Sequence, residues 1–574
     1  MSKYILEMTS LNKNYSDEGR LLLGSWCDTQ DKKTKIVDYH WDDRAKLYDD
    51  YKYLLLVFEK YLAGLTISLN QIHKTNHPID FWRIIVGPWL YYFISISFDR
   101  YETLKYASKK YDIDYARDSL YDQASWVPVD FVEFNNHFYT DEWNHYIYSE
   151  IIKYSKIVST KKSKFNLNPQ KNIKKNNKNK FIKSLLFLLT KLNNKTDKNI
   201  VFTEVDIPQL SLYKLLFRLK SFSFSYYLRV RPNRFKLQND LRHFFFQHSC
   251  SNEFEKILDK LIPINIPICH IEGYDDLVGH SKKIFPKKAK LIITSNAYFS
   301  NEHFKVWCAT QKLNNSKLWV FVHGGHHGTA LFNGSGKLTE DIADRFYGWG
   351  WGEFNLPSSK LSMLRNHDIP KTNDKILFIT YSVSKFSNQL DSSPIGPSFK
   401  DCIKMHSSFF NKISVYKSKD DILIRLKGQK DLWNLNLEYE KCGMQNFVYS
   451  NKETLHESIS KSELVIVSYD STVFLEALTM NTPTCLFIRK DFWEMSESSS
   501  KFFKKFFDCG ILHYDENSLC SHIIEVKDDY LKWWHQDSVQ KLINSFLSEY
   551  GLSSNNWEDD WFNEIKEGLK KINS

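Results

Sequence analysis

Apolar positions recur with a helical period in the first part of the chain. Leu47, Tyr51, Leu54, Phe58 and Leu62 are separated by three or four residues, and this spacing predicts one or two amphipathic helices. The next stretch, DFWRIIVGPWLYYFISISF, is apolar on every face, which predicts a buried helix with a break at its Gly-Pro pair. A short strand, RLLLGSWC, precedes both. The first part of the chain is therefore predicted to be mainly helical.

From about residue 255 the pattern changes to short apolar runs separated by helical stretches. Each run is continuous rather than alternating, which is typical of parallel strands covered on both faces. Helices at 453–461 and 471–480 fall between such runs, so the order is β-α-β and predicts doubly wound parallel sheets. The predicted strands span 290–295, 317–322, 375–381, 421–426, 446–450, 463–468 and 484–488.

Changes in composition predict the domain boundaries. Pro357 and the two serines after it interrupt the rhythm, which places a boundary near 355–372. The Lys/Asn-rich segment 157–198 is predicted to be a mobile insertion. We therefore expect an α/β protein with two doubly wound, Rossmann-like domains that face a cleft, and with a helical N-terminal elaboration. The expected parts are an acceptor-side domain at 1–365, a nucleotide-donor domain at 366–520, and helices at 521–574 that pack back on the N-terminal domain.

The totals are compatible with this architecture. A chain of 574 residues is too long for one ordinary core, and 42% apolar residues exclude global disorder. The net charge is +10, and the segment from Lys161 to Lys183 holds nine lysines and no acid. Such an excess suits a polyanionic or nucleotide-bearing partner or an anionic membrane surface, and it equally suits a solvated loop.

Several classes of protein are disfavoured by what the sequence lacks. The nine cysteines contain no CxxC pair, so neither a zinc framework nor a disulfide scaffold is indicated. The N-terminus has no signal-peptide pattern. The longest uncharged run, Ile84 to Phe98, has 15 residues, short of the roughly 20 that span a bilayer. The expectation is a cytoplasmic protein, with peripheral membrane contact as an open alternative. The aromatic residues show no arrangement typical of RNA binding, so no nucleic-acid partner is expected.

The stretch ELVIVSYDSTVFLEAL is a candidate phosphate site. An apolar strand ends at Ser468, and a helix begins near Ser471 and Thr472. Free N–H groups, the positive end of the helix dipole and two hydroxyls meet there, which suits a phosphate. Glu476 follows about one turn later, where a carboxylate could meet a ribose. The alternative is that Asp470 or Ser471 simply caps the helix.

The stretch VFVHGGHHGTA holds a second candidate. His323 ends an apolar strand, and Gly324 and Gly325 let the backbone approach a ligand closely. A metal site would need carboxylate or cysteine neighbours and a helical His spacing, which are absent here. A histidine that acts in proton transfer or on a leaving phosphate is the favoured reading, and a purely structural turn is the alternative.

Two further groups complete the candidate set. Arg425 lies at the end of the run DILIRL, where its planar guanidinium would suit a phosphate. The stretch DYHWDDR brings His40, Asp42 and Asp43 together. In a two-domain transferase the base for the acceptor should come from the N-terminal half, so these three residues are candidates. A helix-capping, salt-bridged cluster is the alternative.

The chain resembles the transferase family encoded in bacterial O-antigen and surface-polysaccharide gene clusters. The resemblance extends almost end to end, and its later blocks are also similar to GT-B enzymes, in particular capsule Kdo transferases and CDP-glycerol glycerophosphotransferases. In those enzymes a His-Gly element lies in the cleft and a Ser/Thr helix holds the donor phosphate, so the resemblance implies these roles for His323 with Gly324 and for Ser471 with Thr472. The matching blocks are LLLGSWC, DYHWDDRAKLYDDYKYL, FWRIIVGPWL, PICHIEGYDDL, KLIITSNAYFSNEHFKVW, VHGGHHG, DIADRFYGWGW and YDSTVFLEAL.

The residues and the resemblance together predict a metal-independent GT-B-type glycosyltransferase. It would need no cofactor and would transfer a sugar from a nucleotide-sugar donor to a glycan or lipid-linked glycan acceptor, at the cytoplasmic face of the inner membrane. An ulosonic acid carried by CMP is the donor that the resemblance favours. Two alternatives remain open: a polyol-phosphate transferase of the CDP-glycerol type, and a non-catalytic assembly scaffold.

Overall fold

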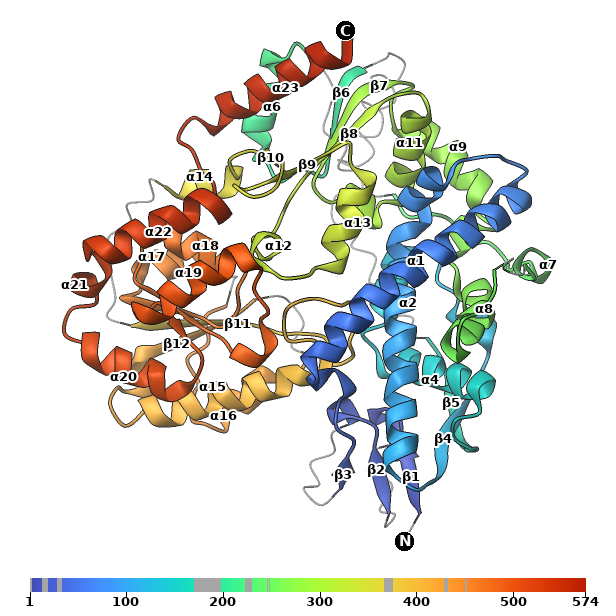
Figure 1. The fold of residues 1–574 in the computed structure, drawn as a ribbon, viewed down its shortest axis with the longest axis horizontal. Helices are drawn as coiled ribbons and strands as arrows, with labels where there is room; N and C mark the ends of the chain where they lie inside the picture. The colour runs from blue at the N-terminus through green and yellow to red at the C-terminus, as the bar shows by residue number, and fades with distance from the viewer. Residues whose placement is uncertain are drawn as a thin grey trace.

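Three parallel β-sheets follow one another along the chain (Figure 1). The computed structural model describes residues 3–12, 19–27, 34–169, 198–221, 230–244, 246, 248–365, 375–427, 432–449 and 452–573. Each sheet has five strands, and helices pack against all three. The predicted α/β class with parallel sheets is confirmed.

The first sheet has the order β3-β2-β1-β4-β5. The sequence indicated a single strand in this region, so the sheet is an addition to the expected helical elaboration. It was missed because β1 to β3 are very short and β4 has no continuous apolar run. The strands are β1 (Tyr4–Glu7), β2 (Arg20–Leu22), β3 (Lys35–Ile36), β4 (Ile113–Tyr121) and β5 (Thr160–Leu167), and the helices are α1 (Arg44–His73), α2 (Ile79–Lys110), α3 (Phe131–His137) and α4 (Asp141–Ser155).

Strand β5 corrects the predicted insertion. Residues 160–167 were assigned to a mobile Lys/Asn-rich segment, but they pair with β4, with Ala116 opposite Thr160 and Tyr121 opposite Leu167. Leu167 is buried at the end of this edge strand. The central part of the predicted insertion, 170–197, lies outside the described residues.

The two long helices of the first unit partly differ from expectation. The predicted amphipathic pattern forms one 30-residue helix, α1. Helix α2 continues through Pro88 without the expected break, because packing on all sides supports the turn whose hydrogen bond the proline removes. By length and composition α2 could cross a membrane, but 94% of its most apolar window is buried within the protein. That degree of burial is typical of a core helix.

The second sheet has the sequential order β10-β9-β8-β7-β6. On one face of this sheet, apolar side chains of the helices α6 and α23 pack in one cluster with side chains of the strands, among them Trp319 and Phe321 of β8. The strands are β6 (Lys198–Thr203), β7 (Ala289–Thr294), β8 (Lys317–Phe321), β9 (Arg345–Gly348) and β10 (Phe354–Asn355), and the helices are α6 (Gln209–Arg218), α7 (Asn239–Arg242), α8 (Glu253–Asn265), α9 (Tyr274–Ile284), α10 (Ala297–Ser300), α11 (Glu302–Leu313), α12 (His326–Thr329), α13 (Gly334–Ile342), α14 (Ser359–Leu364) and α23 (Trp557–Asn573).

The third sheet has the order β12-β11-β13-β14-β15. This is the 2-1-3-4-5 order of doubly wound folds, in which ligands bind beyond the carboxyl ends of the strands where the order reverses. Here that point lies between β11 and β13. The strands are β11 (Ile376–Tyr381), β12 (Ile422–Lys427), β13 (Leu464–Val467), β14 (Thr484–Phe487) and β15 (Leu512–His513), and the helices are α15 (Phe399–Ile413), α16 (Leu435–Glu440), α17 (Leu455–Lys461), α18 (Thr472–Thr479), α19 (Glu497–Asp508), α20 (Glu516–Val526), α21 (Tyr530–Trp534) and α22 (Asp537–Tyr550).

Six of the seven predicted strands are confirmed to within one residue at each end. They are β7, β8 and β11 to β14. The seventh, 446–450, is wrong as a strand: Phe447 forms only an isolated bridge with Ile424. The predicted helices 453–461 and 471–480 are confirmed as α17 and α18. The predicted domain boundary lies partly at 366–374, outside the described residues.

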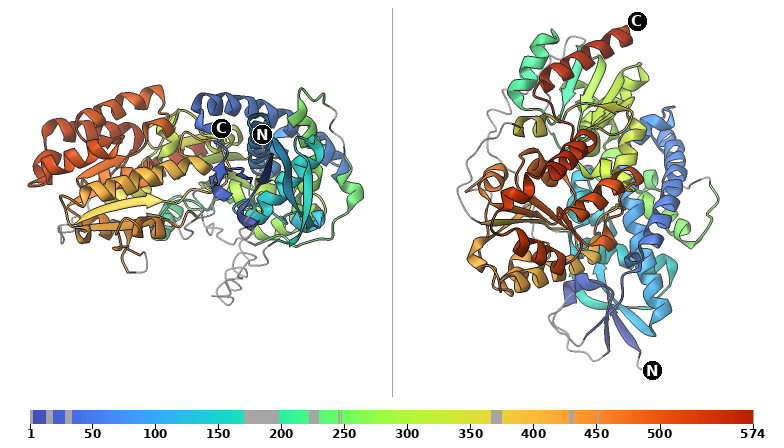
Figure 2. Two further views of the ribbon diagram at one scale, coloured as in Figure 1. Left: turned by 90° about the horizontal axis from the view of Figure 1, so that it is seen from below. Right: turned by 60° about the vertical axis from the view of Figure 1, so that its left-hand side comes forward.

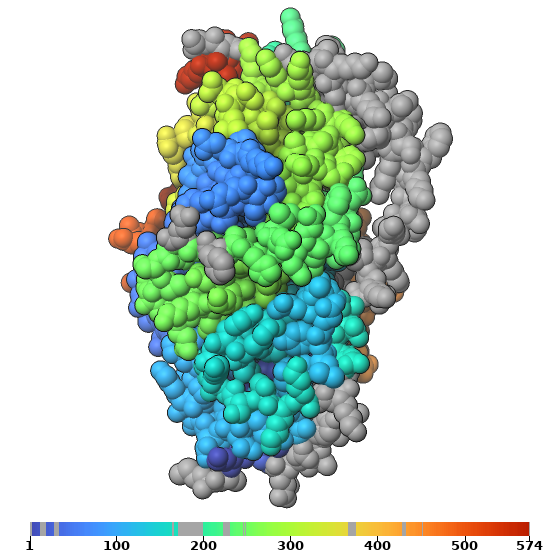
Figure 3. Space-filling model, turned by 90° about the vertical axis from the view of Figure 1, so that its right-hand side faces the viewer, coloured from blue at the N-terminus to red at the C-terminus, as the bar shows by residue number. Residues whose placement is uncertain are grey.

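Packing joins the first two sheets into one body. Helix α2 contacts α4 of the first unit as well as α8, α11 and α13 of the second, and their apolar side chains form one continuous core. Figure 3 shows α1 in blue against the green residues of the second unit.

The third unit has its own core and stands beside the other two in both views of Figure 2. Helix α22 packs on α18 and α19, whereas α23 crosses to the second sheet.

Candidate active site

The turn after β8 meets the start of α18. Strand β8 ends at Phe321, and its chain passes through His323 and the two glycines into the short helix α12. The backbone N–H of Gly325 donates to Oγ1 of Thr472 at 3.3 Å. The contact therefore joins the second unit to the third at the point where the strand order of the third sheet reverses.

The two glycines of this turn differ in the space around them. A Cβ on Gly325 would lie 2.4 Å from Cδ1 of Leu475 and 3.3 Å from its Cγ. A Cβ on Gly324 would meet only ordinary contacts, with His327 at 3.7 Å and Thr472 at 4.0 Å. Gly325 thus allows the close approach of turn and helix, whereas a side chain on Gly324 would have only ordinary van der Waals neighbours.

His326 lies between two carboxylates. Its Nε2 is 3.1 Å from Oδ1 of Asp391, and its Nδ1 is 3.5 Å from Oδ2 of Asp470. Burial alone would lower the pKa of His326, but the two carboxylates outweigh burial and raise the pKa to about 10. The hydroxyl of Thr329 also donates to Asp470, at 2.5 Å. His326 is therefore a fixed cation at neutral pH, and we call it with Asp391 and Asp470 the imidazolium clamp.

The other two histidines of the turn have different environments. His323 is exposed at the end of β8, and its ring centroid is 5.8 Å from that of His327. Burial, with a smaller effect from His323, lowers the pKa of His327 to about 3. His327 is therefore neutral at neutral pH. The structure leaves His323, the predicted catalytic histidine, facing outward at the mouth of the turn.

Ser471 and Thr472 begin α18 without using their hydroxyls to cap it. Ser471 is the N-cap residue, with an extended backbone and no capping hydrogen bond from its side chain. The hydroxyl of Thr472 accepts from Gly325 instead. The alternative reading of Ser471 as a plain side-chain cap is not supported, and the first N–H groups of the helix have no capping side chain there.

Glu476 lies further along α18 and is already paired. Its side chain is fully buried, forms an ion pair with Nζ of Lys360 and lies 3.6 Å from Nε2 of His456. Burial alone would raise its pKa, but His456 and Lys360 lower the pKa below its usual value. In the structure Glu476 links α18 to α14 through its ion pair with Lys360. Its predicted contact with a ribose stays a prediction.

The pair Lys360–Glu476 gives a prediction on stability. Lys360→Met should lower the free energy of unfolding by about 1–3 kcal/mol, because it leaves a buried carboxylate with only His456, while the partial exposure of Lys360 limits the loss. Adding Glu476→Gln should recover most of that loss. Urea unfolding of both variants checks this, and losses that simply add in the double variant would contradict it.

Arg425 has its own partners near α17. Its guanidinium donates to Oγ of Ser458 at 2.9 Å and to the carbonyl of Glu453 at 3.0 Å. Burial lowers its pKa. The hydrogen bonds of Arg425 are thus to the segment around α17 and not to the turn after β8. Its predicted contact with phosphate stays a prediction.

The N-terminal candidates line a hollow of about 560 Å³. Each already has a partner: His40 Nε2 lies 3.2 Å from Asp99, Asp42 accepts from Ser398 at 2.9 Å, and Asp43 caps α1. Burial raises the pKa of Asp42. The hollow is lined by Asp38, Tyr39, His40, Asp42, Asp43, Lys46, Glu102, Lys105, Tyr106 and Lys109.

Arg44 links this N-terminal segment to the imidazolium clamp. Its Nε and Nη2 donate to the two carboxylate oxygens of Glu494 at 2.6 and 2.8 Å. Nη2 also donates to the backbone carbonyls of Asp391 at 3.4 Å and Ser393 at 3.2 Å. Arg44, Asp391, His326 and Asp470 thus form a network that links the N-terminal segment, the turn after β8 and the residues just before α18.

Sequence reasoning missed four members of this network. Arg44 was seen only as part of a charged cluster, and Asp470 only as a helix cap. His326 was present in the HGGHHG stretch but was not singled out. Asp391 carried no local signal, because it lies in a loop after β11 and gains its role from a contact across 65 residues.

A comparison with models of protein families identifies a transferase family. A family model described as LIC12162 family transferase matches residues 4–565. No curated protein matches the chain. The chain covers 58% of the TarM structure named below, less than two thirds of its length. Similar solved structures include a TarM variant of S. aureus in complex with UDP, with 12% identity over 52% of this chain and a TM-score of 0.30. MurG of Acinetobacter baumannii has 10% identity over 65% of this chain and 100% of its own, with a TM-score of 0.33. Alr3699/HepE of Anabaena, in complex with UDP and glucose, has 12% identity over 65% of this chain and 99% of its own, with a TM-score of 0.32.

Proposed function

The chain belongs to the LIC12162 family of transferases, and we propose that it is a glycosyltransferase with a nucleotide-sugar donor. The sugar would pass to a glycan or lipid-linked glycan acceptor. The observation that carries this proposal is the contact between Gly325 and Thr472. It brings a glycine turn to the amino end of a buried helix at the reversal point of a doubly wound sheet, where such folds bind nucleotides.

The donor phosphate would lie at the start of α18. Free N–H groups of the first turn and the hydroxyl of Ser471 would hold it, beside the partly exposed Gly324. His323 would face the leaving group from the mouth of the turn. Asp470 directly precedes this helix end, and its negative charge would repel a phosphate. The imidazolium of His326 reduces that repulsion, so the positive end of the helix dipole can act on the phosphate without requiring a metal ion.

The acceptor would enter from the N-terminal side. The hollow lined by His40, Asp42 and Asp43 contains both carboxylates and ammonium groups, which suits hydroxyl-rich ligands. The raised pKa of Asp42 moves it toward the range of a general base. Asp42 accepts from Ser398 of the third unit, so this hollow borders the unit that would carry the donor.

The substrate class rests on the resemblance of the sequence blocks to surface-polysaccharide transferases. We propose that the product is an O-antigen or capsule glycan, with an ulosonic acid from a CMP donor as the transferred sugar. The reaction would take place at the cytoplasmic face of the inner membrane, with peripheral contact between protein and bilayer.

A nucleotide screen tests the donor site. We expect one of CMP, CDP, UDP, GDP or TDP to raise the Tm of the full chain, because a ligand that binds only the folded state adds about 2.7 kcal/mol at 100 times its Kd. Ser471→Ala should abolish this shift. Because Ser471 makes no capping bond, the variant should otherwise melt close to the wild type.

A matched control separates ligand binding from helix capping. Thr454 does cap its helix, α17, with a complete capping box. Thr454→Ala should therefore lower stability by about 1 kcal/mol and keep the nucleotide shift. A shift that survives Ser471→Ala, or no shift with any nucleotide, would contradict the proposed site and favour a non-catalytic scaffold.

A further inference from the structure

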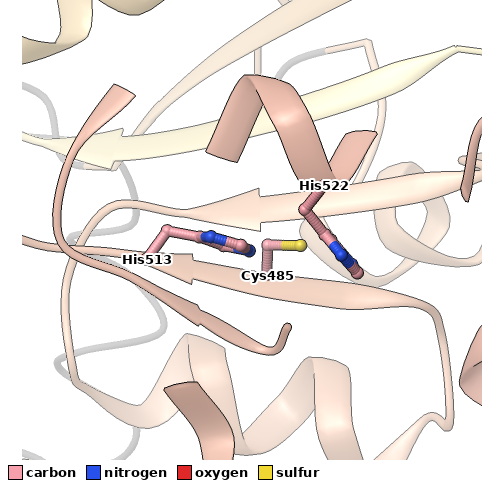
Figure 4. A group of neighbouring side chains, drawn as sticks. All are labelled: Cys485, His513 and His522. Atoms are coloured by element: carbon pink, nitrogen blue, oxygen red, sulfur yellow. The ribbon is translucent and has the colours of Figure 1, made fainter. Parts of the chain in front are cut away.

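Three side chains with metal-ligand chemistry converge at the outer edge of the third sheet. Cys485 lies on β14, His513 ends β15, and His522 lies on α20, which follows β15. Phe487 pairs with His513 in parallel register, so Cys485, two residues before Phe487, points to the same face as His513. Figure 4 shows the sulfur of Cys485 between the two imidazole rings. One ligand atom from each of the three lies within 4.8 Å of the others.

The surroundings bring His522 close to the other two side chains. Gly510 has a φ of +81°, and a Cβ there would lie 2.4 Å from Cε1 of His522. Only glycine leaves room for that ring. Trp533 packs edge-on against the other side of His522, with ring centroids 4.6 Å apart. Nε2 of His522 is nevertheless buried without a hydrogen-bond partner among the described residues, which is unusual for an imidazole held this firmly.

The local charge favours a cation. The two imidazoles each keep a lone pair for a metal ion in their neutral form. The carboxylates with which they interact electrostatically are Asp515 for His513 and Glu525 for His522. A thiol and two neutral imidazoles form a borderline-soft ligand set, which suits Zn²⁺ and similar ions.

Two other groups of this kind among the described residues are less suited to a metal ion. In the group of Cys269, His270 and Glu302, the ammonium of Lys305 already lies 2.8 Å from the Glu302 carboxylate. A second cation there would meet direct repulsion. The group of His248, Cys250 and Asp259 shares its carboxylate with the hydroxyl of Tyr61, which leaves that oxygen less available.

We propose that Cys485, His513 and His522 bind one divalent metal ion of the Zn²⁺ class. The ion would tie α20 to the edge of the third sheet, leaving the fourth tetrahedral position for water. On binding, the thiol of Cys485 loses its proton to solvent and the sulfur forms the metal bond. His513 moves its ring proton from Nε2, where it is hydrogen-bonded to the Gly510 carbonyl, to Nδ1, which then donates to Ser518, 2.9 Å away, and Nε2 binds the metal with no net change in the protons of the ring. The three ligands lie on β14, β15 and α20 and include no residue of the proposed donor site, so the proposal is independent of the proposed transferase activity.

Cobalt substitution tests the site on the full chain. We expect Co²⁺ to bind with one equivalent and to give a near-ultraviolet thiolate-to-metal charge-transfer band together with tetrahedral visible bands, and we expect added Zn²⁺ to displace it. About one proton should be released per ion, because one thiol is deprotonated. Cys485→Ser should remove the charge-transfer band and weaken Zn²⁺ binding by at least about 100-fold.

Two further variants keep the test decisive. His522→Gln should weaken Zn²⁺ binding to a similar extent, and its partly exposed position makes it the variant more certain to fold. Cys402→Ser removes a buried thiol of the same unit outside the group, and it should keep both the band and the affinity. A charge-transfer band that persists in Cys485→Ser, or Zn²⁺ binding unchanged in His522→Gln, would overturn the proposal, as would the absence of stoichiometric Co²⁺ binding by the wild type.

Discussion

Replacing His326 with alanine lowers the free energy of unfolding by about 3–5 kcal/mol, because Asp391 and Asp470 then stay buried without their cation. The same variant should bind the donor nucleotide more weakly, since Asp470 would present an unbalanced charge at the start of α18. Chemical denaturation and nucleotide titration measure the two effects. His323→Ala is the matched control: the residue is exposed, so its stability should change by less than about 1 kcal/mol.

The contribution of His326 should depend on pH in a defined direction. Its folded-state pKa is raised to about 10, above the unfolded value of about 6.5. The stabilisation is therefore complete below pH 6.5 and is lost as the pH rises from 6.5 through about 10. Denaturation of wild type and His326→Gln at pH 6, 8 and 10 should show the difference between them shrinking with pH. A difference that stays constant would contradict a charged clamp.

Replacing Arg44 with alanine should cost about 3 kcal/mol of stability and most of the transferase activity. The bidentate pair of Arg44 with Glu494 is largely buried, and such pairs are strong because two charge-assisted hydrogen bonds act together. Loss of Arg44 also releases the backbone of Asp391 and with it one side of the imidazolium clamp. Urea unfolding and initial rates measure both consequences.

A second arginine provides the comparison for Arg44. Arg83 forms the same kind of two-bond pair with Glu59, but Glu59 is about half exposed and the pair stays within the first unit, between α1 and α2. Arg83→Ala should therefore cost less than about 1 kcal/mol and leave activity unchanged. Equal effects of the two substitutions would contradict a special role for the link through Arg44.

Local patterns were sufficient for six strands of the second and third sheets, but β6, β9, β10 and β15 were not predicted. The buried strands β7, β8 and β11 to β14 are continuous apolar runs, and their ends could be read to within one residue. Of the first sheet, only β2 lies in a run that was predicted as a strand, because β1 and β3 are four and two residues long and β4 has no continuous apolar run. The prediction of a helix break at Pro88 was also wrong, because the effect of this proline on α2 depends on packing rather than on local preference.

The site was predictable where chemistry is local and not where it depends on distant partners. His323, the glycine pair and Ser471 follow directly from a strand end and a helix start. The clamp required knowledge that the loop of Asp391 reaches His326. The same limit applies to Cys485, His513 and His522, because their spacing in sequence fits no common metal-binding pattern, although the parallel register of β14 and β15 places two of them on one face.

Donor turnover is the most direct test of the central claim, that the turn after β8 and the start of α18 form the donor site of a glycosyltransferase. The full chain would be incubated with CMP-linked ulosonic acids, with UDP-, GDP- and TDP-sugars and with CDP-glycerol, and free nucleotide and transferred product would be measured by mass spectrometry. The proposed donor site predicts nucleotide release with formation of a glycosidic bond from at least one sugar donor, abolished in Ser471→Ala. Release from CDP-glycerol alone, with a phosphodiester product, or nucleotide binding without any release, would contradict it.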